Sequence, residues 1–207
     1  MRKSKSEIIR NHYIPRVNKS LENYQILDWA SSEGQQLRFE QLLKYADLEN
    51  KSILDVGCGL ADLPVFISSK NIPFNYVGVD LLPEMVTLAK EKYPAGRYLV
   101  ADIFSESKDS ILDKIGLDSL DIIYCSGALN LNLGNNDDFV KNALLKMTEL
   151  ASESVIVTML HARADVIEDE YYAYYPSDII KIVKPVCRDI FIADDYLYND
   201  FTLICQC

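Results

Sequence analysis

Short apolar runs alternate with stretches of helical periodicity along most of this chain. Each run is short enough for a buried strand, and the stretches between them repeat apolar residues at helical spacing. Strands that alternate with helices imply a parallel sheet covered by helices on both faces. The expected strands are 51–56, 75–80, 97–101, 119–125 and 155–160, and the expected helices are 60–70, a helix opened by Pro83, a weak helix near 107–115, one starting at 135–138 and one near 177–184.

The two ends of the chain depart from this alternation. Residues 21–45 have the pattern of a helical lead-in, with Phe39, Leu42 and Leu43 on one face. Two closing strands, at about 187–193 and 200–206, are joined by a short connection, which implies an antiparallel hairpin. We therefore expect residues 1–48 to form a helical lead-in, or lid, packed on the core, and residues 49–207 to form that core.

The most informative motif spans residues 53–62, Ile-Leu-Asp-Val-Gly-Cys-Gly-Leu-Ala-Asp. A buried strand ends in an acid, and a Gly-x-Gly turn then enters a helical pattern. Strand, acid, glycine turn and helix together predict a nucleotide-type pocket at the carboxyl end of a parallel strand. The alternative is a tight strand-to-helix connection that binds nothing, because glycines occur in many turns.

The charges around this turn select among nucleotide ligands. A dinucleotide fingerprint places a third glycine or alanine where this chain has Asp62, and Asp55 lies just before the turn. Two carboxylates would repel a pyrophosphate and attract a ligand with a positive end. S-adenosylmethionine has an ammonium and a sulfonium and no phosphate. Asp80 ends the next strand and is placed to accept bonds from ribose hydroxyls, which S-adenosylmethionine and NAD both have.

The chain resembles the class I S-adenosylmethionine-dependent methyltransferases. The glycine loop 54–59 and the ribose acid at the end of 77–80 carry the resemblance, together with 101–104 and 122–127. It implies an α/β, Rossmann-like, doubly wound sheet of seven strands, mostly parallel, with an antiparallel strand from the C-terminal hairpin. It also implies S-adenosyl-L-methionine as cofactor and S-adenosyl-L-homocysteine as product. Ala61 replaces a frequent third glycine of the family, which we expect to be tolerated if this position is not left-handed.

The resemblance also assigns cofactor contacts. Asp80 would bind the ribose, Asp102 would accept the adenine amino group, and Ser126 would face the sulfur end. For Asp62 a helix-capping role is an equal alternative, for Asp102 the alternative is a cap of the following turn, and for Arg38 a solvated surface position is the alternative to binding the cofactor carboxylate. The complete predicted set is Arg38, Asp55, Gly57, Cys58, Gly59, Asp62, Asp80, Leu81, Asp102, Ile103, Ser126 and Gly127.

Methyl transfer from a sulfonium mainly requires that the protein hold the acceptor in line with the bond between sulfur and the methyl carbon. A general base is needed only if the acceptor must lose a proton. His161, just past the fifth strand, is the catalytic candidate, with a structural histidine as the alternative. Asn130, Tyr172 and Tyr175 are the candidate acceptor contacts, although the tyrosines also suit ordinary packing. The loop after residue 125 lacks the Asn/Asp-Pro-Pro-Tyr/Phe sequence with which related enzymes grip planar amino nitrogens, so such acceptors are disfavoured.

Composition narrows the class of partner. The 207 residues carry a formal net charge of −10, which disfavours nucleic acid, although the first twenty residues are basic. We expect a small-molecule acceptor; an RNA or protein methyltransferase and a non-catalytic S-adenosylmethionine-binding subunit are the alternatives. No apolar run reaches membrane-spanning length, and five cysteines without Cys-x-x-Cys spacing favour reduced thiols in a cytoplasmic protein without a metal.

Overall fold

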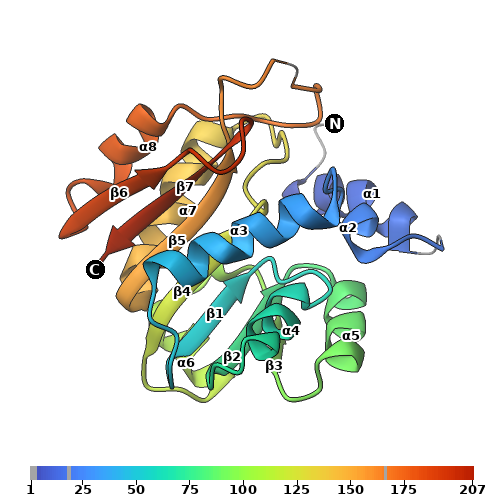
Figure 1. Ribbon diagram of the computed structural model, residues 1–207, viewed down its shortest axis with the longest axis vertical. Helices are drawn as coiled ribbons and strands as arrows, with labels where there is room; N and C mark the ends of the chain where they lie inside the picture. The colour runs from blue at the N-terminus through green and yellow to red at the C-terminus, as the bar shows by residue number, and fades with distance from the viewer. Residues whose placement is uncertain (1–3, 18–19, 166) are drawn as a thin grey trace.

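The computed structural model describes residues 4–17, 20–165 and 167–207. Within these ranges the chain forms one seven-stranded sheet of order β3-β2-β1-β4-β5-β7-β6 (Figure 1). Strands β1 to β5 are parallel, and β7 runs antiparallel to both β5 and β6. The predicted fold class, including the C-terminal hairpin, is confirmed. The strands are β1 Ser52–Val56, β2 Asn75–Asp80, β3 Arg97–Val100, β4 Leu120–Ser126, β5 Ala151–Leu160, β6 Asp189–Ala193 and β7 Asp200–Gln206.

The order of the strands determines where a ligand-binding crevice can form. β1 pairs with β2 on one side and with β4 on the other, so the connections leaving β1 and β4 turn in opposite directions. A crevice opens at such a switch point, outside the carboxyl ends of the strands. The residues that follow Val56 and Ser126 therefore face each other across this crevice.

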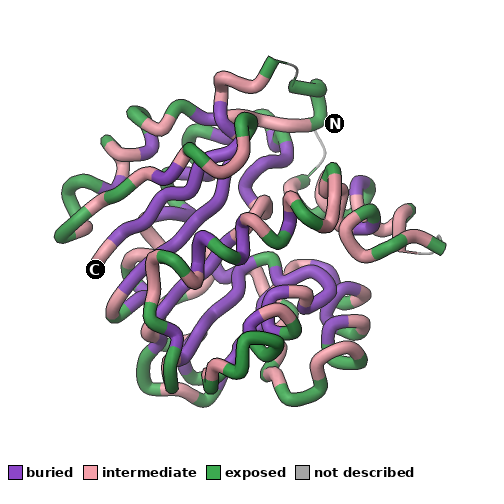
Figure 2. The backbone as a smooth tube through the Cα atoms, viewed as in Figure 1, coloured by how far each residue is buried: buried purple, intermediate pink, exposed green. Residues whose placement is uncertain are grey.

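Helices cover both faces of the sheet, and the strands between them are the most buried part of the chain (Figure 2). Apolar residues of α3 and α4 pack on one face, and those of α6, α7 and α8 pack on the other. The helices are α1 Lys5–Val17, α2 Asn23–Ile26, α3 Ser32–Tyr45, α4 Asp62–Ser69, α5 Pro83–Lys92, the short 3-10 helix η1 Ile103–Ser105, α6 Lys108–Ile115, α7 Asn136–Leu150 and α8 Pro176–Val183.

Two boundaries differ from the sequence prediction by more than two residues. The lead-in expected at 21–45 is interrupted between α2 and α3, where Asp28 takes a left-handed backbone with φ 61° and the Ser31 hydroxyl accepts a bond from Gly34 N, 3.0 Å away, to start α3. Strand β5 begins at Ala151 rather than at 155, because α7 runs directly into it.

The N-terminal helices pack on the core beside the carboxyl ends of the strands (Figure 1). Ile9 and Tyr13 of α1 join a small apolar cluster with Ile26, Leu82 and Met85. No helix in the described ranges is long and apolar enough to cross a membrane. The N-terminal segment is thus positioned against the end of the sheet where the crevice lies.

Candidate active site

A single pocket lies at the carboxyl ends of the central strands. The core supplies its floor through the loops after β1, β2 and β4 and through η1. The N-terminal segment and the stretch after β5 supply its outer wall, through Lys5, Ile9, Tyr13, Leu27, Asp28, Trp29 and Tyr171. Predicted cofactor residues on four separate strand ends are therefore brought to one cavity.

The glycine loop forms one side of this pocket. Gly57 and Gly59 have φ values of 74° and 50°, and Gly57 N donates to Val79 O at 2.8 Å. A Cβ on Gly57 would lie 2.6 Å from the Ala128 Cβ, so only glycine allows the two loops to approach this closely. The loop keeps its backbone open to the pocket.

Ala61 differs from what the sequence suggested. We expected alanine to be tolerated here if the position were not left-handed, but Ala61 has φ 57° and ψ 43°. A left-handed alanine costs roughly 1–2 kcal/mol, because its Cβ crowds the following carbonyl. Its methyl group is fully buried, which offsets part of that cost.

Asp80 ties the loops after β1 and β2 together. Its Oδ2 accepts a bond from Gly59 N at 3.0 Å, and its Oδ1 accepts one from Leu82 N at 2.9 Å. Burial raises the pKa of this carboxyl group, although the two backbone donors oppose the shift. Asp80 and the neighbouring Leu81 both line the pocket. An anchored carboxylate here retains lone pairs for a ligand diol.

Two further acids lie around the glycine loop. Asp55 is buried, and burial raises its pKa to about 7 although the Tyr76 hydroxyl donates to it at 2.8 Å. Asp62 is the first residue of α4; it forms an ion pair with Lys92 and accepts a bond from Asn23 Nδ2 at 3.0 Å. Asp55 and Asp62 line the pocket together with Cys58.

The far end of the pocket lies at η1. Asp102 caps η1 by accepting from Phe104 N at 3.3 Å, and it also forms an ion pair with Lys5 of α1. Ile103 is buried beside it and lines the pocket. The cap proposed as an alternative for Asp102 is present, and its carboxylate faces the pocket as well.

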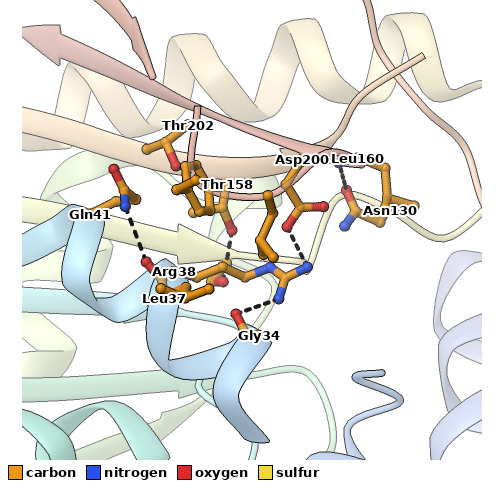
Figure 3. Close-up of polar contacts among 12 residues, drawn as sticks. Gly34, Leu37, Arg38, Gln41, Asn130, Thr158, Leu160, Asp200 and Thr202 are labelled. Atoms are coloured by element: carbon orange, nitrogen blue, oxygen red, sulfur yellow. Dashed lines mark hydrogen bonds and ion pairs between the residues drawn. The ribbon is translucent and has the colours of Figure 1, made fainter. Parts of the chain in front are cut away.

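The loop after β4 faces the glycine loop. The Ser126 hydroxyl shares a hydrogen bond of 2.7 Å with Thr158, and Gly127 has φ 74°. A Cβ on Gly127 would lie 2.4 Å from the Trp29 ring, so Trp29 packs directly on this backbone. Asn130 follows; its Oδ1 accepts from Leu160 N at 3.1 Å (Figure 3). Ser126, Gly127 and Asn130 all line the pocket.

A family model described as a methyltransferase domain matches residues 53–165, more than half of the chain and the whole of this strand-end architecture. The chain belongs to the class I S-adenosylmethionine-dependent methyltransferase family. The matched segment runs from the glycine loop through β5. The N-terminal helices and the C-terminal hairpin lie outside it.

Individual methyltransferases share the fold at low identity. Magnesium protoporphyrin IX methyltransferase from Synechocystis PCC 6803, solved with bound S-adenosylhomocysteine, superimposes with a TM-score of 0.69 at 14% identity, covering 97% of this chain and 98% of that one. Phosphoethanolamine N-methyltransferase 1 from Haemonchus contortus gives 0.68 at 10% identity over 97% of this chain and 48% of that one. The putative methyltransferase 235L of Invertebrate iridescent virus 6 is 36% identical over 64 residues, which are 31% of this chain and only 24% of that protein.

Arg38 lies outside the methyltransferase pocket. Its guanidinium is buried, forms an ion pair with Asp200 and donates to Gly34 O at 2.7 Å (Figure 3). It also stacks on the Trp29 ring, 4.3 Å from the centroid. Arg38 does not line the pocket to which the cofactor is expected to bind, and it does not have the solvated surface position that was the alternative. It supports the pocket from behind, through Trp29.

The structure does not bring three further predicted residues, those for catalysis and for acceptor binding, to the pocket. His161 is buried against Phe201, and its Nδ1 accepts from Arg163 N at 3.0 Å, which is the structural alternative. Tyr172 donates to Asp137 at 2.8 Å outside the pocket, and Tyr175 is exposed before α8. None of the three lines the pocket.

The structure instead brings Tyr171 to the pocket. The isolated bridge between Leu131 and Tyr171 holds it beside the loop after β4, and its hydroxyl donates to Asp28. Asp28 in turn lies 2.9 Å from Nε2 of His12, a residue that sequence reasoning could not place. The sequence offered one sign of a turn at this place, the Asp28-Trp29 pair inside an otherwise helical lead-in.

Proposed function

We propose that this protein transfers a methyl group from S-adenosylmethionine to a small-molecule acceptor. The observation that carries the proposal is the pocket itself, in which glycine-loop and strand-end residues face a wall built from α1, residues 27–29 and Tyr171. A wall of this kind suits an acceptor small enough to enter the cavity. We propose residues 1–48 as the lid of this site.

The charge of the lining supports the cofactor assignment. The described residues of the lining include five aspartates, at 28, 55, 62, 80 and 102, against the single cation Lys5. A dinucleotide would bring its pyrophosphate among these carboxylates, whereas the sulfonium and ammonium of S-adenosylmethionine are attracted by them. We assign the ribose to Asp80, the adenine to Asp102 and Ile103, and the methionine end to the loop 55–62.

The placement of α1 weighs against an RNA or protein acceptor. Its cations are paired with carboxylates of this chain: Lys5 with Asp102, Arg10 with Glu84 and Arg16 with Asp28. Cations engaged in this way are less available to neutralise phosphates. Arg2, Lys3 and Lys19, which complete the basic N-terminal set, lie outside the described residues. Two similar methyltransferases carry small molecules in their names, a porphyrin and phosphoethanolamine. We place the activity in the cytoplasm, consistent with five free cysteines.

Transfer of labelled methyl from S-adenosylmethionine into a cell extract tests the acceptor class. After fractionation by size, we expect the label in the small-molecule fraction, in an amount that does not change on treatment with ribonuclease. Label in RNA or protein would contradict a small-molecule acceptor. Binding of S-adenosylhomocysteine without labelling of any fraction would favour the non-catalytic subunit instead.

A further inference from the structure

We propose that Asp28 binds the nucleophilic nitrogen of the methyl acceptor, and that this acceptor is a small neutral amine. The inference rests on the proposed function, since it names the acceptor class of the same pocket. It assigns a binding role to a residue outside the matched methyltransferase domain.

The part of the pocket beside Asp28 is left open by the cofactor assignment. The loop 55–62, Asp80 and the residues around Asp102 account for the methionine, ribose and adenine parts. Part of the remaining lining lies beside the end of β4 and is formed by Trp29, Asn130, Tyr171 and Asp28. The bridge between Leu131 and Tyr171 fixes the two sides of this subsite relative to each other.

Asp28 is held in a costly and well-defined position. Its backbone is left-handed, with φ 61°, which is uncommon outside glycine and marks constrained sites. Its Oδ2 lies 2.9 Å from His12 Nε2 and 2.9 Å from Arg16 Nη2, and it accepts the Tyr171 hydroxyl. Its Oδ1 accepts no hydrogen bond from the described residues. Two hydrogen bonds, from Arg16 and Tyr171, fix one oxygen, and the other oxygen of this partly exposed side chain is left for a ligand.

Asn130 supplies the second polar group of the subsite. The residue is buried, with an exposed fraction of 6%. Its Oδ1 is committed to Leu160 N, while its Nδ2 donates to none of the described residues. Nδ2 is not among the fully buried atoms without a partner, so it is open to the pocket that Asn130 lines and can donate to a ligand there. The donor on Asn130 and the acceptor on Asp28 therefore define a subsite for a molecule with an N–H group and a hydrogen-bond acceptor.

The chemistry of transfer selects an amine over an acid. The lone pair of a neutral amine forms the new N–C bond as the C–S bond breaks, and the C–S electron pair stays on sulfur. Positive charge moves from sulfur to nitrogen, and the product ammonium then loses a proton to water. A carboxylate fixed beside the nitrogen stabilises the charge that develops there. A carboxylic acid acceptor would meet the Asp28 carboxylate with no uncommitted cation beside it, because Arg16 is paired with Asp28 itself and Lys5, the cation of the described lining, is paired with Asp102.

Asp28→Asn tests this role with little disturbance of the backbone, because asparagine also accepts the left-handed conformation. Asp137→Asn is the matched control: Asp137 likewise accepts a tyrosine hydroxyl, from Tyr172, but lies outside the pocket. Labelled S-adenosylmethionine is offered with a panel of small primary and secondary amines, phenols and carboxylic acids. We expect label in amines, a loss of about 100-fold in kcat for Asp28→Asn, and no comparable loss for Asp137→Asn.

The binding of S-adenosylhomocysteine separates this inference from the proposed function. We expect its affinity to stay within about threefold of the parent protein in Asp28→Asn, which also shows that the variant folds. If the parent protein does not bind it, the proposed function fails and this inference fails with it. If the parent protein binds it, then labelling of phenols or acids alone, no labelling of any amine, or full turnover by Asp28→Asn would overturn the role of Asp28 and leave the cofactor assignment intact.

Discussion

Replacing Asp80 by alanine is expected to weaken binding of S-adenosylhomocysteine about 100-fold. The carboxylate is placed for the ribose hydroxyls, and it also holds the glycine loop through Gly59 N and the following turn through Leu82 N. Losing hydrogen bonds to a charged group costs about 1.5–3 kcal/mol, and about 2.7 kcal/mol corresponds to 100-fold. Titration followed by the emission of Trp29, the single tryptophan of the chain and part of the pocket wall, measures the affinity.

Asp121→Ala is the matched control for this variant. Asp121 also anchors a neighbouring strand, because its Oδ2 accepts from Ser52 N and from the Ser52 hydroxyl, both at 2.7 Å. It does so at the amino ends of the strands, away from the pocket. We expect Asp121→Ala to lower stability and keep its affinity. Equal losses of affinity in both variants would mean that the effect of Asp80 is general destabilisation, and an unchanged affinity in Asp80→Ala would remove its ribose role.

Replacing Arg38 by methionine is expected to lower the free energy of unfolding by about 3–5 kcal/mol. Arg38 and Asp200 form a buried ion pair, with Asp200 only 1% exposed, and neither Asp200 oxygen accepts a bond from another described residue (Figure 3). Removal of one partner leaves a buried charge without compensation, which accounts for a cost of about that size. Urea denaturation measures it.

Two further variants separate the buried charge from lost packing. Arg38→Met combined with Asp200→Leu removes both charges, and we expect most of the stability to return. Lys181→Met breaks an exposed pair with Asp178, and we expect a change of about 0.5 kcal/mol or less. A double variant no more stable than Arg38→Met would contradict the account.

The free energy of unfolding of Arg38→Met should depend on pH in a characteristic way. Burial already raises the pKa of Asp200, and loss of Arg38 removes the charge that opposes this shift. An acid whose pKa is raised by folding binds its proton more tightly in the folded state, so it destabilises the fold as pH rises through the interval between the two values. We expect Arg38→Met to recover stability as pH falls below neutrality, relative to the double variant.

Much of the fold was predictable because buried strands and amphipathic helices leave strong local patterns. The end of the pocket that we assign to the cofactor was predictable from short-range sequence alone, through the strand that ends at Val56, the turn at Gly57 and Gly59, and the acid at Asp80. The break before α3 was not predicted, because it is Asp28, and not a glycine, that adopts the left-handed conformation there. Ala61 escaped prediction for the same reason.

Apart from Asn130, the end of the pocket that we assign to the acceptor was not predictable, because contacts between distant segments create it. Arg38 turns toward Asp200, a residue 162 positions later, rather than toward the cofactor. Among the tyrosines after β5, the bridge with Leu131 selects Tyr171, whereas sequence favoured Tyr172 and Tyr175. Such contacts depend on how the N-terminal helices and the stretch after β5 pack against each other over the sheet. The periodicity of apolar residues within each segment does not predict this packing.

The most direct test of the account is calorimetric titration of the purified protein with S-adenosylhomocysteine and, separately, with NAD. Five aspartates around the pocket, with Asp80 placed for a ribose, predict saturable binding of S-adenosylhomocysteine at one site and much weaker or no binding of NAD. Tighter binding of NAD, or no binding of S-adenosylhomocysteine, would contradict the assignment of this pocket.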